Sequence, residues 1–182
     1  YKDFYALKNV NLTIPKGEIY GLVGENGAGK TTLIRLLTGL NFKSEGEIIL
    51  FGHKDNLQHE RSKIGCTIEM PALYKDMTAS QNLEVQRIQR GIPNKKCITD
   101  TLELIGLSNA GKKRVANFSL GMKQRLALGV ALLGEPEFLI LDEPVNGLDP
   151  TGIIELRELL KKLVKEREVT ILISSHILSE LH

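Results

Sequence analysis

The sequence predicts an α/β fold, with a parallel sheet as its core and a helical subdomain inserted between two of the strands. Short apolar runs alternate with amphipathic helical segments along most of the chain, and such alternation is typical of parallel sheets. A glycine-rich loop joins one of these runs to the helix after it. Between residues 72 and 133 the apolar residues follow a helical period throughout, which predicts the inserted subdomain.

The first half of the chain is predicted to contain strands around one helix. Residues 7–14 alternate apolar and polar, which predicts a half-buried strand. Residues 19–23 form a nearly continuous apolar run, typical of a strand covered on both faces. After the glycine-rich loop, residues 31–40 are predicted to be helical, with Gly39 near the end of the helix. Two further strands are expected here, at residues 47–51 and 63–68.

The inserted segment is predicted to contain helices that are separated by glycines. The first has Thr78 or Ser80 as its cap and stops at Gly91. The second ends at Gly106 and the third starts at Ser119. The chain then returns to apolar strands, which are expected at residues 138–141 and 169–173. Between these strands one helix face carries a core stripe of Ile153, Leu156, Leu160 and Leu163.

Composition excludes several classes of protein. Apolar residues make up 42% and charged residues 25% of the 182 positions, as in an ordinary soluble globular protein. The net charge of +2 comes without a basic block, so no nucleic-acid partner is expected. Cys66 and Cys97 lack the spacing of metal ligands, which favours a reducing compartment. No apolar run approaches the roughly 20 residues that span a bilayer, so any membrane role requires a partner.

The glycine-rich loop has the pattern Gly-x4-Gly-Lys-Thr and lies between an apolar strand and a helix. Its glycines let backbone N–H groups turn inward, and the helix N-terminus beyond them attracts anions. Lys30 can reach the β- and γ-phosphates of a nucleotide, and the Thr31 hydroxyl can ligate Mg²⁺. The alternative is a chance glycine-rich turn, which the position between strand and helix disfavours. The predicted phosphate-binding residues are Gly24, Glu25, Asn26, Gly27, Ala28, Gly29, Lys30, Thr31 and Thr32.

Two acids follow the apolar run at 138–141. Asp142 and Glu143 therefore emerge at the C-terminal edge of a buried strand, where ligands bind in open parallel sheets. We expect Asp142 to hold Mg²⁺ and Glu143 to polarise the attacking water. The alternative is that both acids only end and solvate the strand. The phosphate-binding loop elsewhere in the chain favours the catalytic interpretation.

Residues 117–125 lie between these two motifs and read Asn-Phe-Ser-Leu-Gly-Met-Lys-Gln-Arg. The order and spacing of the three motifs resemble the ATP-binding-cassette (ABC) ATPases, from residue 1 to residue 176. The resemblance implies a single ABC ATPase domain over residues 1–182. Residues 1–71 and 134–182 would form its RecA-like P-loop NTPase core together with an antiparallel β subdomain. The helical subdomain is then at 72–133. Compared with the family, we expect the domain to be truncated at both ends.

The resemblance also implies a head-to-tail dimer. In that arrangement Ser119 and Gly121 face the γ-phosphate bound by the second subunit, and Asp149 crosses the interface. The stretch departs from the family's usual Leu-Ser-Gly-Gly-Gln at three positions, but the serine and the second glycine match. The alternative to a role in a dimer is that Ser119 only caps the helix that it begins. His176 follows the last apolar strand and matches the family's switch histidine. The predicted catalytic residues are thus Lys30, Glu143 and His176.

Two more site residues come from the resemblance. Tyr1 lies 29 positions before Lys30, as does the family's adenine-stacking aromatic, although Phe4 and Tyr5 compete for this role. Glu69 stands where the family usually has a glutamine that touches Mg²⁺, and a carboxylate can also ligate this ion. The alternative is that glutamate has replaced glutamine here without a functional consequence. The predicted metal ligands are Thr31, Glu69 and Asp142.

A glutamate at position 69, followed by Met-Pro-Ala-Leu-Tyr, resembles the bacitracin-type and lantibiotic-immunity ABC exporters. The resemblance implies a Mg-dependent ATPase that binds ATP with a second nucleotide-binding subunit. We expect it to energise a separate membrane permease, for export of a peptide antibiotic or similar substrate, from the cytoplasmic face of the membrane. The alternative is a soluble ABC ATPase that acts on ribosomes or nucleic acid. A non-catalytic ATP switch is disfavoured because Lys30, Glu143 and His176 are all present.

Overall fold

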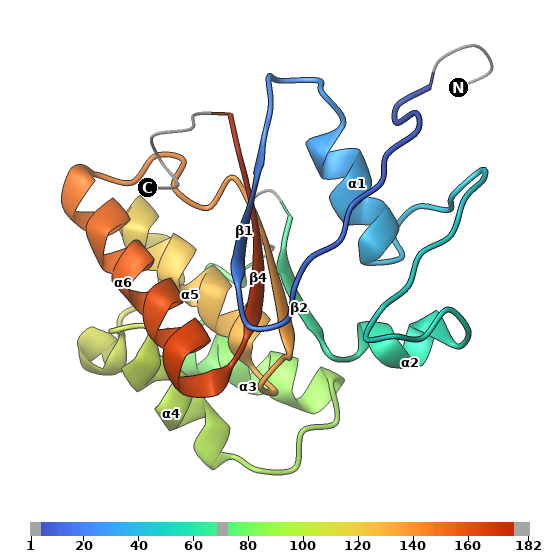
Figure 1. The fold of residues 1–182 in the computed structure, drawn as a ribbon. Coiled ribbons are helices and arrows are strands. Elements are labelled where there is room, and N and C mark those ends of the chain that lie inside the picture. The colour runs from blue at the N-terminus through green and yellow to red at the C-terminus, as the bar shows by residue number, and fades with distance from the viewer. Residues whose placement is uncertain (1–4, 69–72, 177–182) are drawn as a thin grey trace.

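A computed structural model describes residues 5–68 and 73–176 of the chain (Figure 1). Four parallel strands form one sheet, in the order β1-β4-β3-β2. The strands are β1 (Ile19–Val23), β2 (Ile64–Thr67), β3 (Phe138–Asp142) and β4 (Thr170–Ser175). The predicted α/β fold with a parallel sheet is therefore confirmed.

Helices lie on both faces of this sheet. In Figure 1, α1 lies on one side of the strands, and α5 and α6 lie on the other. None of the helices in the described ranges has the length and apolarity needed to cross a membrane. The α-helices are α1 (Lys30–Leu37), α2 (Leu57–Arg61), α3 (Ala79–Gln89), α4 (Lys96–Leu104), α5 (Leu120–Leu132) and α6 (Pro150–Arg167). Two single-turn 3₁₀ helices, η1 (Ser108–Ala110) and η2 (Val115–Asn117), precede α5.

The central strand β3 is buried on both faces because its side chains alternate between two apolar clusters. Leu139 and Leu141 join the larger cluster, which also contains buried residues of α5 and α6. Phe138 and Ile140 join the smaller cluster with Ile34 of α1. A strand buried in this way reads as a continuous apolar run, as the sequence of β3 does.

The edge strand β1 differs from its prediction. We expected both of its faces to be covered, but Ile19 is 42% and Val23 41% exposed. Tyr20 and Leu22 pack against the smaller apolar cluster on the other face. The reason is topological: β1 pairs with β4 alone, so it lies at the edge of the sheet, and an apolar run does not encode strand order.

The strands predicted at 7–14 and 47–51 are not formed, so the antiparallel β subdomain is absent from the described residues apart from one isolated bridge between Leu50 and His53. Asn9 and Phe51 adopt left-handed backbone angles, with φ of 54° and 52°. Such residues interrupt an extended strand and its ladder of hydrogen bonds. Residues 7–14 alternate between polar and apolar, and residues 48–51 are all apolar, but neither segment pairs its backbone with a strand.

The chain between β2 and β3 forms helices and turns in its described part. Thr78, and not Ser80, caps α3: its hydroxyl accepts from the Gln81 backbone N–H, and the Gln81 side chain accepts from the Thr78 N–H. This reciprocal capping box satisfies two N–H groups that the helix leaves unpaired. Gly106 follows α4 with φ of 68°, as expected for a glycine that ends a helix. The boundaries at 72 and 133 stay a prediction.

Close packing of α5 on β2 depends on Gly65. A Cβ atom at this position would lie 2.1 Å from the backbone carbonyl oxygen of Ala131, which cannot move without displacing the helix. We expect Gly65→Ala to lower the free energy of unfolding by about 3 kcal/mol or more, measured by urea denaturation. Gly46→Ala is the control, because its φ is 81° but its surroundings are open, and about 1 kcal/mol is expected. Equal losses in the two variants would contradict the packing argument.

Candidate functional site

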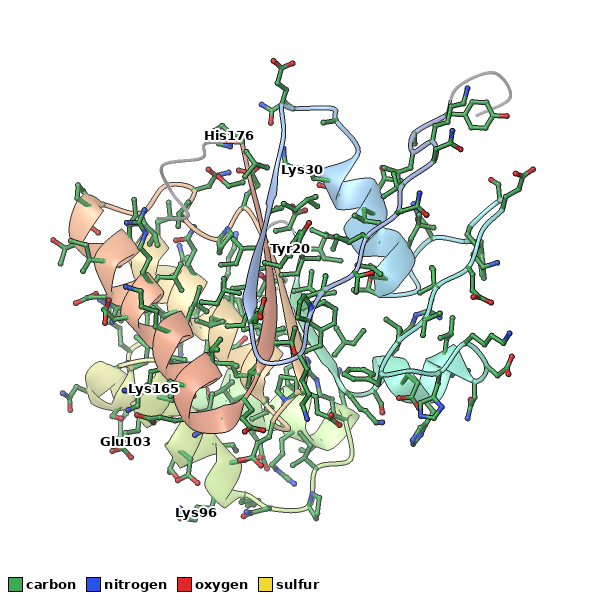
Figure 2. The ribbon with its side chains drawn as sticks, in the orientation of Figure 1. Tyr20, Lys30, Lys96, Glu103, Lys165 and His176 are labelled. Carbon is green, nitrogen blue, oxygen red and sulfur yellow. The ribbon has the colours of Figure 1, made fainter. Side chains whose placement is uncertain are left out.

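Those predicted phosphate and metal residues that the structure describes gather at one edge of the sheet, beyond the C-terminal ends of β1, β3 and β4. The loop after β1 is joined to β4, because the Gly24 N–H donates to the Ser175 carbonyl at 3.3 Å. Figure 2 shows Lys30 and His176 at this same end, while Lys96 and Lys165 lie toward the opposite end. The edge is where parallel α/β sheets bind ligands, as predicted from the sequence.

The loop from Gly24 to Gly29 folds into a tight turn ahead of α1. Gly29 has φ of 92°, and a Cβ there would come within 2.7 Å of the Ala6 carbonyl oxygen and of the Leu7 side chain. Only glycine fits this backbone and this contact. Gly29 supplies no side chain to cap α1. The N-terminal N–H groups of α1 are thus the donors that an anion beside the loop can use.

Lys30, the first residue of α1, directs its ammonium group back over the loop. The side chain is buried, and Nζ donates to the carbonyl oxygens of Gly24 at 2.6 Å and Glu25 at 3.2 Å. Nζ also lies 3.5 Å from Oε1 of Glu143, which is 19% exposed. A cation is therefore fixed between the loop and the acidic end of β3.

Asp142 is buried at the end of β3, and two hydroxyl groups hold its carboxylate. Thr31 Oγ1 donates to Oδ2 at 2.9 Å, and Ser174 Oγ donates to Oδ1 at 2.5 Å. The structure thus brings together two of the three predicted metal ligands. A hydroxyl and a carboxylate are hard oxygen donors, and Mg²⁺ is held by one or two carboxylates together with phosphate oxygens. The residues present fit that ion.

Glu143 follows Asp142 in a left-handed conformation, with φ of 50°. Its Oε2 lies 2.5 Å from Nδ1 of His176 and accepts a hydrogen bond from Asn146 Nδ2 at 3.2 Å. Non-glycine residues with such backbone angles cost roughly 1–2 kcal/mol and cluster at functional sites. Lys30, Asn146 and His176 therefore surround one carboxylate, and these contacts are consistent with a positioned general base.

Ser119, Gly121 and Asp149, which are predicted to act on the nucleotide bound by a second subunit, lie together at a different place in the chain's fold. Ser119 and Asp149 each cap a helix: the Ser119 hydroxyl accepts from the Met122 N–H and the Asp149 carboxylate from the Gly152 N–H, both at 3.2 Å. With Gly121 they line a hollow of about 540 Å³ between the starts of α5 and α6. The Ser N-cap, which was the alternative interpretation of Ser119, is formed. Ser119, Gly121 and Asp149, here called the Ser119 group, are a second cluster.

The Ser119 group is distinct from the phosphate-loop group, which we define as Lys30, Thr31, Asp142, Glu143 and His176. None of the phosphate-loop group is among the described residues that line the hollow. A hydrogen-bond path connects the two groups: Gln124 of α5 donates to the Asn146 carbonyl, and Asn146 donates to Glu143. The ion pair between Arg125 and Glu155 joins α5 to α6 beside the hollow.

Sequence reasoning placed most of these residues and missed several. Tyr1 and Glu69 lie outside the described residues. Ser174, Asn146 and Gln124 were not predicted, although each makes a hydrogen bond in or beside the site. One signal for Ser174 was available, because the apolar run at 169–173 is followed by two serines that lead directly to the predicted site residue His176.

The chain is similar to known proteins of one family. Residues 7–146 match the family model described as ABC transporter. The chain is 46% identical to the bacitracin transport ATP-binding protein BcrA of Enterococcus faecalis over all of its length, and spans 59% of that protein. It is 49% identical to the lantibiotic transport ATP-binding protein SrtF of Streptococcus pyogenes, covering 96% of this chain and 75% of that one.

Solved structures agree with these relatives. A dimeric post-hydrolysis state of the ATP-binding cassette MJ0796, bound to ADP and Pi, has a TM-score of 0.86 and 29% identity, covering 97% of this chain and 82% of that one. The cbiO1 protein of Clostridium perfringens, part of the ABC transporter complex cbiONQ, has a TM-score of 0.84 and 31% identity, covering 94% of this chain and 72% of that one. The shared fold therefore covers almost the whole chain.

Proposed function

The chain belongs to the ABC transporter family, and we propose that it is the part of a bacterial transporter that binds and hydrolyses ATP. One observation carries the proposal: a buried lysine at the start of α1, a hydroxyl-bound aspartate and a positioned glutamate meet at one sheet edge. These are a phosphate-binding cation, a metal ligand and a general base. Their arrangement around a glycine-rich loop supports nucleoside triphosphate hydrolysis.

In the proposed reaction Lys30 and the N–H groups of α1 bind the terminal phosphates. The Thr31 hydroxyl and the Asp142 carboxylate would hold Mg²⁺, which would neutralise phosphate charge. Glu143 orients the attacking water and accepts its proton, and His176, which lies against the same carboxylate, contacts the γ-phosphate. Glu69 remains a proposed third metal ligand and Tyr1 the proposed contact to the adenine.

Two copies of the chain are proposed to complete each site. A single chain holds the phosphate-loop group and the Ser119 group in separate places, and Ser119 begins α5, whose N-terminus favours an anion. A head-to-tail pair would set the Ser119 group of one subunit against the phosphates held by the other. MJ0796, which has the same fold, was observed as a dimer.

The transported substrate and the membrane partner are proposed from the relatives. The chain spans about 60% of the length of the bacitracin relatives it matches, so it represents only part of proteins of that size. Relatives are named for bacitracin transport and for lantibiotic transport. We propose export of a peptide antibiotic or similar amphipathic substrate by a separate membrane permease. The ATPase would bind that permease at the cytoplasmic face of the membrane.

Loss of the Lys30 ammonium tests ATP use directly. We expect Lys30→Ala to lower kcat/KM for Mg-ATP roughly 10- to 100-fold, because it removes charge-assisted hydrogen bonds to phosphate. The measurement is phosphate release by the intact protein over a range of ATP concentrations. Lys161→Ala is the control, since Lys161 is 65% exposed and pairs with Glu158 on α6. The proposal fails if the wild-type protein releases no phosphate, or if both variants match it.

A further inference from the structure

We propose that Ser174 is a positioning residue, whose hydroxyl fixes the metal-binding carboxylate of Asp142 and the backbone of Glu143 in one arrangement. The inference rests on the proposed ATP hydrolysis and assigns a role to a residue that no motif of the site contains. Ser174 lies opposite Asp142 in the parallel register of β3 and β4, and its exposed fraction is 0%.

The Ser174 hydroxyl makes two bonds that join the adjacent acids. It donates to Asp142 Oδ1 at 2.5 Å and accepts from the backbone N–H of Glu143 at 2.9 Å. A hydroxyl has one proton to give and lone pairs to accept with, so both contacts can exist at once. The metal ligand and the general base therefore share one buried partner.

Asp142 gains a defined orientation from this contact. Its two carboxylate oxygens have different partners, Ser174 on Oδ1 and Thr31 on Oδ2. Thr31 is itself a proposed metal ligand, so its hydroxyl is expected to turn to the metal when one binds. Ser174 belongs to a central strand of the sheet and keeps Oδ1. Oδ2 is then the oxygen left for the metal or its water. A hydrogen-bond partner that does not touch the metal, such as Ser174, can orient a metal ligand in this way.

Glu143 gains support for a strained backbone. Its N–H lies 2.9 Å from the Ser174 hydroxyl oxygen and 3.2 Å from the Ser174 carbonyl oxygen, and both accept from it. The left-handed φ of 50° persists where surrounding contacts determine it. This conformation places the Glu143 carboxylate beside Lys30 and His176. Without the hydroxyl, one of the two contacts that hold the turn is lost.

The experiment compares variants of the intact protein that each lose one buried hydroxyl from β4. Ser174→Ala removes the proposed positioning group. Thr170→Val is the matched control, because Thr170 Oγ1 accepts from the Gly17 N–H at 2.9 Å at the other end of the same strand. Ser174→Cys nearly keeps the volume and replaces the hydroxyl with a weaker donor and acceptor. Mn²⁺ is the probe for the metal, and its binding in the presence of ATP is measured by electron paramagnetic resonance.

We expect Ser174→Ala to bind Mn²⁺ about 10- to 100-fold more weakly in the presence of ATP, and to lose turnover to a similar extent. Ser174→Cys is expected to fall between the wild-type protein and Ser174→Ala. ATP affinity measured in EDTA, with a fluorescent ATP analogue, is expected to stay within about 2-fold, because the phosphate loop is untouched. Thr170→Val is expected to match the wild type in both measurements.

Two results separate this inference from the function on which it rests. A wild-type protein that binds no ATP would overturn the proposed function and the role of Ser174 with it. A wild-type protein that binds and hydrolyses ATP, while Ser174→Ala keeps its Mn²⁺ affinity, would overturn the positioning role alone. Equal loss of metal-free ATP binding in Ser174→Ala and Thr170→Val would also overturn it, since any buried hydroxyl of β4 would then have the same effect.

Discussion

Glu143→Gln is expected to lower ATP turnover by about 10³-fold and to yield a dimer that forms only with Mg-ATP. The amide keeps the shape of the side chain and still accepts a hydrogen bond, but it cannot take a proton from water. Lys30, Asn146 and His176 keep their places around it. Because ATP binding is preserved and hydrolysis is not, the closed pair of subunits should accumulate.

The measurement is the mass of the protein in solution, by light scattering, with Mg-ATP, with Mg-ADP and without nucleotide. Glu158→Gln is the control, since this glutamate of α6 is 67% exposed and pairs with the exposed Lys161. It removes the same charge and should neither dimerise with ATP nor lose turnover. A monomeric Glu143→Gln protein under saturating Mg-ATP would argue against a nucleotide sandwich of two chains alone.

Local sequence patterns were sufficient to locate Lys30, Thr31, Asp142 and Glu143, whereas His176 was placed by the family resemblance. A strand, a glycine-rich loop and a helix start are neighbours in the chain, so the placement of Lys30 and Thr31 follows from residues close to them. Asp142 could be placed beside them because parallel strands end at a common edge. The structure bears out this reasoning for one contact, the hydrogen bond of 2.9 Å between Thr31 and Asp142.

Features that depend on strand order or backbone pairing could not be read from the sequence. The apolar run of β1 does not say that the strand lies at the sheet edge, where Ile19 and Val23 are exposed. Ser174 touches Asp142 only because β4 lies next to β3, with these residues in register. Alternation at 7–14 predicted a strand, but Asn9 turns the backbone away from it. The first two features depend on contacts between distant segments, and the third depends on a local backbone turn at Asn9.

Mixing two impaired variants tests how the two groups of residues combine. Gly121→Asp should inactivate the Ser119 group, because it sets a carboxylate at the N-terminal turn of α5 where a phosphate is proposed to lie. The fold should tolerate it: a Cβ at Gly121 meets Leu148 at an ordinary 3.4 Å, and an acid is favourable at a helix start. Lys30→Ala inactivates the phosphate-loop group. Each variant alone is expected to keep no more than about a tenth of the wild-type activity.

In a head-to-tail pair, the Gly121→Asp subunit contributes an intact phosphate-loop group and the Lys30→Ala subunit contributes an intact Ser119 group. One of the two sites is then complete, so an equal mixture is expected to recover about a quarter of wild-type ATPase activity if the sites act independently. Mixing Lys30→Ala with Glu143→Gln is expected to give no such recovery, because both substitutions lie in the phosphate-loop group. Each of the two sites in a mixed pair then contains one substituted phosphate-loop group. Recovery in both mixtures, or in neither, would contradict shared sites. Recovery in the first alone would mean that Ser119 and Lys30 of one chain serve different nucleotides.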